Sequence, residues 1–236
     1  MFNDILRQKA NESQIKLDEN QIDSLRRYYE LLVEWNQKMN LTALTEPEDV
    51  ALKHFCDSIL LLSYADIPLN SSLIDVGTGA GFPSLPIKIV RPDIKLCLLD
   101  SLNKRLIFLQ EVVNELNLND VQIVHARAED GARKKELREK FDFATSRAVA
   151  QLNVLSEYCL PYVKVGGAFL AMKGKYSEEE ISNSKNAIKL LGGKIEKVDT
   201  YNLIDSSERT IINIKKNNAT DKSYPRTSAK IKSKPL

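Results

Sequence analysis

After residue 72 the sequence alternates short, β-branched apolar runs with helical patterns, and this alternation constrains the fold more than any other feature. Such alternation builds βαβ units with right-handed crossovers, so it predicts a parallel sheet covered by helices on both faces. Two further runs, at 194–201 and 209–215, flank a short polar loop and predict an antiparallel pair. We therefore expect an α/β fold with a doubly wound, mostly parallel sheet and an antiparallel final strand pair. The other expected strands lie at 73–76, 95–100, 121–125, 141–146 and 167–173, and the helices between them at about 85–90, 103–116 and 151–163.

The first 64 residues show only helical patterns. Asp18 and Gln21 have the spacing of a capping box and precede an amphipathic stretch over 22–39. Thr45 and Glu48 repeat that spacing before a second helical stretch, which continues to about residue 62. An amphipathic helix needs a surface that covers its apolar stripe. These helices therefore predict an N-terminal cap on the sheet.

The composition limits the classes to which the chain can belong. Hydrophobic residues make up 43% of the 236 positions and charged residues 28%, which is typical of a globular protein. No apolar run approaches the roughly 18 residues that a membrane span needs, and the N-terminus has no secretory apolar region. We expect three parts: a helical cap over 1–66, a sheet domain over 67–216 and a basic tail over 217–236.

The cysteines and the tail carry weaker signals. Cys56, Cys97 and Cys159 are an odd set without C-x-x-C spacing, which excludes a disulfide framework and a zinc ribbon and favours a reducing cytoplasm. Residues 215–236 hold seven Lys and Arg residues against one acid, Asp221, although the whole chain carries only +2. Such a tail fits an anionic partner or a solvated, fraying terminus, and its charge alone does not separate the two.

A glycine loop follows the first expected strand and opens the first helix. Gly77, Gly79 and Gly81 let the backbone turn sharply and approach a ligand closely, and the missing Lys-Ser/Thr pair excludes a Walker A loop. The third glycine comes one position too early for a dinucleotide fingerprint, and Asp75 precedes the loop; both features are typical of Rossmann-like methyltransferases that use S-adenosylmethionine. Asp100, at the end of the next strand, fits the ribose hydroxyls of either cofactor. Both S-adenosylmethionine and NAD therefore remain open.

The type of methyl acceptor can be narrowed by elimination. Amine methyltransferases often carry an Asn/Asp-Pro-Pro-aromatic motif after the fourth strand, whereas this chain has Ser146-Arg147-Ala148. Carbon-5 methylation of a pyrimidine needs a cysteine nucleophile, and all three cysteines are predicted to be buried. His54 and His125 lack the spacing of metal ligands or of a triad and are interpreted as structural. The acceptor that remains is an atom that is already nucleophilic, and a ring nitrogen with a free lone pair fits.

Six ordered segments together carry a specific resemblance, which covers nearly the whole chain. The chain resembles the bacterial RsmG family, also called GidB. The resemblance implies a Rossmann-like class I methyltransferase that uses S-adenosylmethionine to methylate N7 of a guanine in 16S ribosomal RNA, usually numbered 527. It implies the small ribosomal subunit or its assembly intermediate as partner, no metal and no membrane; we expect a cytoplasmic monomer. The segments are NLTALTEPEDVALKHFCDSILLL, LIDVGTGAGFPSLPIKIVRPD, LLDSLNKRLIFLQEV, HARAED, FDFATSRAVA and AMKGK.

The resemblance also assigns cofactor contacts by position. It implies that Gly77 and Phe82 hold the cofactor at the loop, that Ala128 and Glu129 hold its adenine, and that Arg147 lies at the mouth of the site. Arg147 is also the best candidate for a residue near the acceptor, and no catalytic residue is assigned. From the residues alone, Glu129 fits an ordinary first-turn acid and Arg147 fits the ion-pair partner of a carboxylate equally well. The predicted cofactor-binding set is Gly77, Phe82, Ala128, Glu129, Arg147, Gly79 and Asp100.

Four basic residues are candidates for RNA contacts. Lys173 ends the fifth expected strand, and Arg133, Lys134 and Lys135 begin a basic cluster. A solvated helix face explains that cluster at least as well.

Two other functions remain open. An NAD-linked oxidoreductase would need a Tyr-x-x-x-Lys pair or a comparable acid after a suitable strand, and none is found. The second open function is non-enzymatic: a factor that binds S-adenosylmethionine and assists RNA assembly, with any methyl transfer only incidental.

Overall fold

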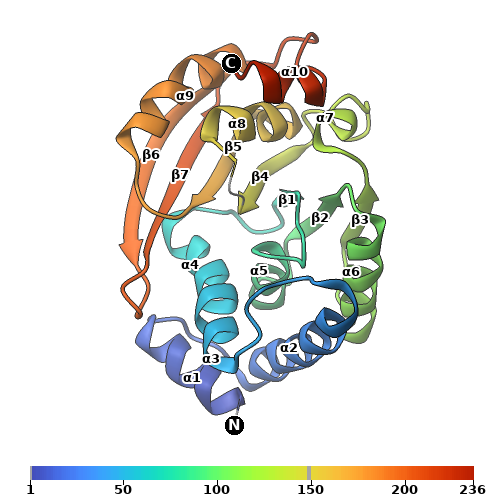
Figure 1. The fold of residues 1–236 in the computed structure, drawn as a ribbon, viewed down its shortest axis with the longest axis vertical. Coiled ribbons are helices and arrows are strands. Elements are labelled where there is room, and N and C mark those ends of the chain that lie inside the picture. Colours follow the sequence, from blue (N-terminus) through green and yellow to red (C-terminus); the bar gives the residue numbers. More distant parts are fainter. Residues whose placement is uncertain (1, 148–149) are drawn as a thin grey trace.

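The computed structural model describes residues 2–147 and 150–236, and its centre is a seven-stranded sheet in the order β3-β2-β1-β4-β5-β7-β6 (Figure 1). Neighbouring strands from β3 to β5 run parallel, whereas β7 runs antiparallel to both β5 and β6. The predicted sheet, including its antiparallel final pair, is therefore confirmed. The strands are β1 (Ser72–Val76), β2 (Lys95–Asp100), β3 (Val121–His125), β4 (Phe141–Arg147), β5 (Val163–Lys173), β6 (Gly193–Asn202) and β7 (Glu208–Lys216).

Alternating residues of the central strands belong to two separate hydrophobic cores. Leu73 and Leu98 face the core that also holds the N-terminal helices, α5 (Ser84–Val90) and α6 (Asn103–Glu115). Ile74 and Leu99 face the core formed with α8 (Leu152–Cys159) and α9 (Glu178–Leu190). Because successive side chains of a strand point to opposite faces, the continuous apolar runs bury both faces of the sheet.

The N-terminal helices lie on one side of the sheet and share its first core, and α2 packs against α5 and α6 (Figure 1). They are α1 (Phe2–Glu12), α2 (Glu19–Met39), α3 (Pro47–Asp49), the π-helical η1 (Val50–Cys56) and α4 (Asp57–Tyr64). The Asp18–Gln21 capping box is confirmed.

The second predicted cap is wrong. The helical stretch starts with Glu46 as N-cap and Pro47 in its first turn, and no side chain caps it. Proline suits this place because the first helical N–H has no partner within the helix. The expected helix over 151–163 also ends early, because Leu160–Tyr162 forms the 3-10 turn η2, which contains Pro161.

The C-terminal segment, residues 217–236, folds back onto the domain. Its short helix α10 (Ser228–Ser233) contacts α8, and Ile231 is fully buried. Figure 1 shows α10 beside α8 and α7 (Ala128–Gly131), with the C-terminus close by. The interpretation of this segment as a fraying terminus is therefore wrong.

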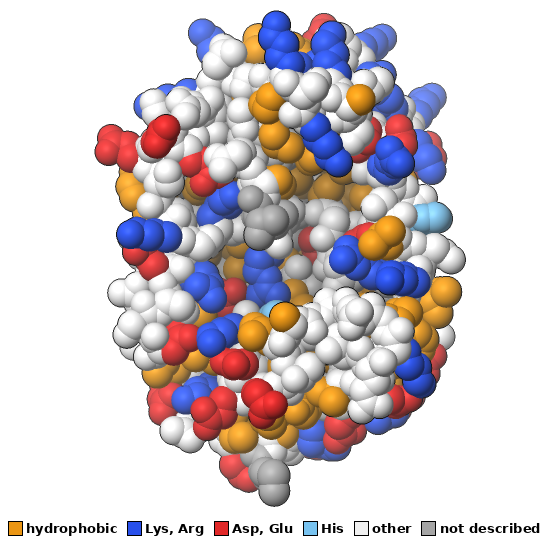
Figure 2. All heavy atoms as spheres, viewed as in Figure 1, with side chains coloured by type: hydrophobic (Ala, Val, Ile, Leu, Met, Phe, Trp, Pro, Cys, Tyr) orange, Lys and Arg blue, Asp and Glu red, His pale blue; other side chains and the backbone are white. Residues whose placement is uncertain are grey.

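One face of the molecule is hollowed near its middle, and blue Lys and Arg side chains lie around this hollow (Figure 2). Within the described residues, no helix is both long and apolar enough to cross a bilayer.

Candidate active site

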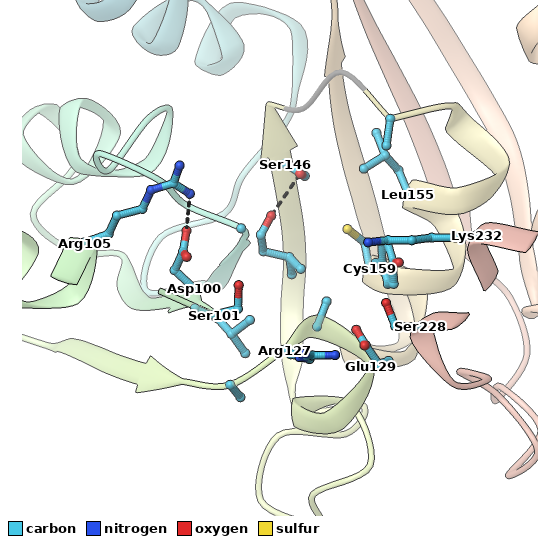
Figure 3. A pocket seen from close by; sticks show the side chains of 17 residues that line it. Asp100, Ser101, Arg105, Arg127, Glu129, Ser146, Leu155, Cys159, Ser228 and Lys232 are labelled. Atoms are coloured by element: carbon cyan, nitrogen blue, oxygen red, sulfur yellow. Dashed lines mark hydrogen bonds and ion pairs between the residues drawn. The ribbon is translucent and has the colours of Figure 1, made fainter. Parts of the chain in front are cut away.

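A cavity of about 470 Å³ opens at the carboxyl ends of the central strands. Gly77 follows β1, Asp100 ends β2, and Ala128 and Glu129 open α7 after β3; all four line this cavity. Figure 3 shows Asp100 and Glu129 in its wall. Strand order changes direction at β1, between β2 and β4, and an open α/β sheet binds its ligands at such a switch point. We call this space the first cavity. It brings together four of the seven residues that the sequence assigns to the cofactor.

Each of the three loop glycines suits its position for a different structural reason. Gly77 has φ +74°, and a Cβ there would meet nothing within 4 Å, so the backbone lies open to the cavity. Gly79 does not line the cavity; its N–H donates to Oδ2 of Asp100 at 2.9 Å. At Gly81, a Cβ would lie 2.5 Å from the hydroxyl of Tyr28 on α2. The third glycine therefore permits close packing against the N-terminal helices.

Asp75 lies fully buried beneath the loop. Its Oδ2 accepts hydrogen bonds from the hydroxyls of Thr78 (2.8 Å) and Ser84. Burial raises the pKa of Asp75 to about 7, although the hydrogen bonds from Ser84 and Thr78 and the charge of Arg147 act in the opposite direction. The acid before the loop thus ties both ends of the glycine segment to β1.

Asp100 presents a fixed carboxylate to the first cavity. Oδ1 accepts the Leu102 N–H at 2.9 Å, and Oδ2 accepts the Gly79 N–H. The guanidinium of Arg105, which also lines the cavity, lies 3.3 Å from Oδ2. Backbone amides therefore hold this carboxylate in place, which is what the recognition of neighbouring hydroxyls requires.

A second cavity of about 310 Å³ contains Arg147. Ser146 and Arg147 are successive residues at the carboxyl end of β4; Ser146 lines the first cavity and Arg147 the second. This division follows from the alternation of side chains along a strand. Ala148, which completes the sequence motif, lies outside the described residues. The second cavity is lined by Leu44, Lys53, His54, Asp57, Arg147, Met172, Lys173, Gly174 and Arg209.

A buried carboxylate organises the second cavity. Asp57 accepts hydrogen bonds from Arg147 Nη1 and Arg209 Nε, both at 3.1 Å, and from the Tyr201 hydroxyl at 3.2 Å. Its side chain is only 3% exposed. The carboxylate thus joins α4 to the ends of three strands, β4, β6 and β7, and offsets part of the charge of the two guanidinium groups. The alternative interpretation of Arg147, as the ion-pair partner of a carboxylate, is confirmed.

His54 is fixed in its neutral form beside Arg147. Its Nδ1 accepts a hydrogen bond from Arg147 Nη2 at 3.2 Å, so its proton resides on Nε2, which donates to Thr42 Oγ1 at 2.8 Å. Burial, and then the charge of Arg147, lower the pKa of His54 to about 3. The predicted structural histidine is confirmed, and its bonded nitrogens exclude a role as general base in this arrangement.

Phe82 lies beneath this group and not on the wall of the first cavity. Its ring stacks on His54 at 4.5 Å and on Tyr28 at 5.3 Å between centroids. The Arg147 guanidinium lies 5.2 Å from its centroid, within the range of a cation–π contact. Phe82 therefore supports the residue that lines the second cavity.

The four candidates for RNA contact have different surroundings. Lys173 lines the second cavity, but its ammonium pairs with Glu180 at 2.9 Å and donates to the Ala150 carbonyl. Arg133 donates to the Pro225 carbonyl in the C-terminal segment. Lys134 and Lys135 are exposed. These two lysines are therefore the members of the set that point freely to solvent.

The cysteines behave as small apolar residues, as predicted. All three are buried, and burial raises the pKa of the Cys56 and Cys97 thiols to about 12 and that of Cys159 well above its usual value. Cys159 lines the first cavity but cannot supply a thiolate under these conditions. No cluster of His, Cys, Asp or Glu that could hold a metal was found among the described residues.

Several residues of the cavities have no counterpart in the sequence predictions. Asp57 and Lys53 lie in a segment already quoted for the resemblance, so their position was visible although their role was not. Ser228 and Lys232 belong to the basic tail, where no periodic pattern indicated a wall of a cavity. The residues missed in the first cavity include Ser101, Arg105, Arg127, Leu155, Tyr158, Ser228 and Lys232.

Comparison of the fold with solved structures agrees with the architecture. The YcgJ protein of Bacillus subtilis superimposes with a TM-score of 0.57 over 70% of this chain and 100% of that chain, at 13% identity. At this identity the similarity concerns the fold alone, which is that of Rossmann-like class I methyltransferases.

Sequence comparison is far more specific. The family model described as rRNA small subunit methyltransferase G, GidB, matches residues 21–212. The ribosomal RNA small subunit methyltransferase G of Clostridium beijerinckii is 48% identical over 100% of this chain and 99% of its own length. That of Acetivibrio thermocellus is 53% identical over 94% of this chain and 91% of its own. With the two cavities at the strand ends, these matches confirm the resemblance: the chain is a methyltransferase and belongs to the rRNA small subunit methyltransferase G (GidB) family.

Proposed function

We propose that this enzyme transfers a methyl group from S-adenosylmethionine to N7 of a guanine in 16S ribosomal RNA, the one usually numbered 527. The observation that carries the proposal is the position of the two cavities on either side of the carboxyl end of β4. Ser146 lines one and Arg147 the other. A methyl transfer needs a donor and an acceptor held next to each other, and both cavities include residues at the carboxyl end of the same strand.

The residues of the first cavity fit S-adenosylmethionine. The carboxylate of Asp100 suits two ribose hydroxyls, and the short side chain of Ala128 leaves room for a flat base beside Glu129. The open backbone at Gly77 allows close approach of the methionine end. A volume of about 470 Å³ lies in the range of pockets for ligands of this size. The donor supplies an electrophilic methyl group on its sulfonium.

The second cavity supports a ring nitrogen as acceptor. Guanine N7 has a lone pair in the ring plane, so its methylation needs no prior loss of a proton. The groups around Arg147 agree with this requirement, because His54 is neutral with both nitrogens bonded. Asp57 neutralises part of the guanidinium charge and so reduces the repulsion that a base would meet as it becomes positive. We assign Arg147 and Phe82 to the acceptor side, with Gly77, Gly79, Asp100, Ala128 and Glu129 on the donor side.

The surroundings of the cavities suit a nucleic-acid partner. Basic side chains line the rim of the hollow face (Figure 2), and Lys53, Lys173 and Arg209 line the second cavity. A guanine in folded RNA has to leave its stack to reach such a cavity, at a cost of a few kcal/mol. We propose that residues 67–216 form the S-adenosylmethionine-dependent methyltransferase domain, that residues 1–66 form a helical cap over one face of the sheet, and that the enzyme acts on small-subunit RNA in the cytoplasm.

The test is methyl transfer from labelled S-adenosylmethionine to naked 16S RNA and to small subunits from cells that lack this protein. Nucleoside analysis and mapping follow. We expect label in 7-methylguanosine at one position. An Arg147→Ala protein should keep donor binding and lose transfer, whereas a Lys185→Ala control, exposed on α9 and lining neither cavity, should keep both. Label in another nucleoside would overturn the assignment of the acceptor, and a wild-type protein that binds no donor would overturn the proposal as a whole.

A further inference from the structure

The C-terminal segment forms part of the wall of the first cavity. Ser228 and Lys232, both on α10, line the cavity together with residues from the ends of β1, β2 and β4. In Figure 3 the side chain of Lys232 extends from α10 toward the cavity, which Cys159 of α8 also lines. The segment therefore reaches a ligand-sized space that the rest of the chain leaves open on this side.

This placement is fixed by a buried ion pair. Glu157, on α8, is 1% exposed, and its two carboxylate oxygens accept hydrogen bonds from Arg226 Nε (2.9 Å) and Nη2 (2.6 Å). The backbone N–H of Arg226 donates to the same carboxylate at 2.8 Å. A bidentate pair of this kind specifies geometry as well as contact. It anchors the chain two residues before α10 begins.

Further contacts hold the segment on both sides of that pair. The guanidinium of Arg138 donates to the carbonyl oxygens of Thr220 (2.8 Å), Asp221 (3.1 Å) and Tyr224 (2.8 Å). Near the end of the chain, Asn153 Nδ2 donates to the Leu236 carbonyl at 3.1 Å. Residues of the basic cluster that could have contacted RNA phosphates are thus used to hold the C-terminal segment.

Helix α8 links the segment to the first cavity. Asn153 and Glu157, spaced four residues apart on one side of the helix, hold the C-terminal segment. Leu155 and Cys159, with the same spacing on another side, line the cavity. A ligand that contacts α8 and α10 together therefore contacts an assembled wall.

The cations of the wall differ in their surroundings. Arg105 pairs with Asp100. Arg127 lies beside Glu129, at the end where the base is expected (Figure 3). Lys232 enters near Leu155 and Cys159, away from Arg127, and within residues 2–147 and 150–236 no carboxylate pairs with it. The only anionic group of a sulfonium nucleoside derived from methionine is its α-carboxylate.

We propose that Lys232 binds the α-carboxylate of the methyl donor, and that the C-terminal segment is therefore part of the donor site. This inference rests on the proposed function, because it takes S-adenosylmethionine as the ligand of the first cavity. Because Lys232 is exposed, we expect a charge-assisted hydrogen bond of this kind to correspond to about fivefold in affinity.

The test compares two ligands that differ at the methionine end. S-adenosylhomocysteine carries the α-carboxylate, and 5′-methylthioadenosine lacks the whole amino-acid end. Dissociation constants are measured by calorimetry for the wild type, for Lys232→Met and for a Lys230→Met control. Lys230 is exposed on the same helix and does not line the cavity. We expect Lys232→Met to lower the affinity for S-adenosylhomocysteine about fivefold and to leave the affinity for 5′-methylthioadenosine unchanged, while the Lys230→Met control changes neither affinity.

The outcomes separate this inference from the proposed function. If wild-type protein binds neither ligand, the donor assignment itself fails. If wild-type protein binds both and Lys232→Met binds them as the control does, Lys232 takes no part in the donor site and the inference is wrong. If Lys232→Met lost affinity equally for both ligands, the carboxylate assignment would also be overturned, since 5′-methylthioadenosine has no carboxylate.

Discussion

Replacing Asp57 by alanine would remove the carboxylate that joins two arginines and a tyrosine. Asp57 is 3% exposed, while the side chains of Arg147 and Arg209 are 20% and 21% exposed. Loss of one partner from a buried ionic group costs about 3–5 kcal/mol, because the remaining charges stay uncompensated. Partial solvent access to both guanidinium groups favours the lower end, about 3 kcal/mol. Because domains of this kind are stable by about 5–15 kcal/mol, the variant should still fold.

Urea unfolding measures this loss, with the single tryptophan, Trp35, as a fluorescent reporter in α2 and circular dichroism as a second probe. The matched control is Asp49→Ala. Asp49 also pairs with a cation one helical turn away, Lys53 at 2.7 Å, but its side chain is 38% exposed. An exposed pair contributes less than about 1 kcal/mol, so the control should unfold almost like the wild type.

The same variant separates the two cavities. Asp57→Ala should lower methyl transfer strongly, because Arg147 loses an ionic partner that orients it, yet it should leave donor affinity within about twofold, because Asp57 does not line the first cavity. If Asp57→Ala lowered the free energy of unfolding by less than about 1 kcal/mol, as Asp49→Ala should, the reasoning about the buried carboxylate would be refuted. A fall in donor affinity as large as the fall in transfer would refute the separation of donor and acceptor sides.

Three further predictions follow from other contacts. Gly81→Ala should lower the free energy of unfolding by about 3 kcal/mol, because it combines φ +95° with a 2.5 Å approach of the new Cβ to the Tyr28 hydroxyl. In a Tyr28→Phe background this loss of stability should be smaller by at least about 1 kcal/mol. Losses that simply add in urea unfolding would contradict this prediction. The folded-state pKa of Asp75, about 7 against 3.8 in the unfolded chain, means that the folded state holds the proton more tightly between these values. The wild-type free energy of unfolding should therefore fall by up to about 4 kcal/mol between pH 4 and 7 relative to Asp75→Asn, and parallel pH profiles would disprove it. If Lys134 and Lys135 contact RNA phosphates, replacing both by alanine should reduce the slope of log affinity against log salt by about 1.5; an unchanged slope would exclude them.

The sheet could be predicted because its signals are local. Each strand is a short β-branched run bounded by polar residues, and the pattern repeats often enough to indicate parallel βαβ units and the closing antiparallel pair, although not the order of the strands. The Asp18–Gln21 capping box was also readable, since both partners lie within one helical turn. The cap expected at Thr45 failed because Pro47 offers a different start to the helix.

Part of the first cavity could be predicted for the same reason. Gly77 follows a strand and Asp100 ends one, and parallel strands bring these ends together, whereas Ala128 and Glu129 were assigned through the family resemblance. The second cavity was only partly visible. Arg147 could be named from its motif, but its contact with Asp57 spans 90 positions in sequence, and no periodicity indicates which carboxylate it meets.

The C-terminal segment shows where sequence patterns stop being informative. Its charge suggested an anionic partner or a solvated end, whereas Arg226 pairs with Glu157, 69 positions away, and Ile231 is buried. A single apolar residue among lysines carries no periodic signal. The position of Lys232 in the wall of the first cavity depends on these tertiary contacts and could be found only from the structure.

A crystal structure of the enzyme with S-adenosylhomocysteine tests the central claim most directly, which is that the first cavity holds the donor and the second the acceptor. We predict the ligand in the first cavity, with its ribose hydroxyls on Asp100, its adenine beside Ala128 and Glu129, and its sulfur directed toward the end of β4 where Arg147 lines the second cavity. Density for the ligand in the second cavity, or at any place away from Asp100, would contradict the account.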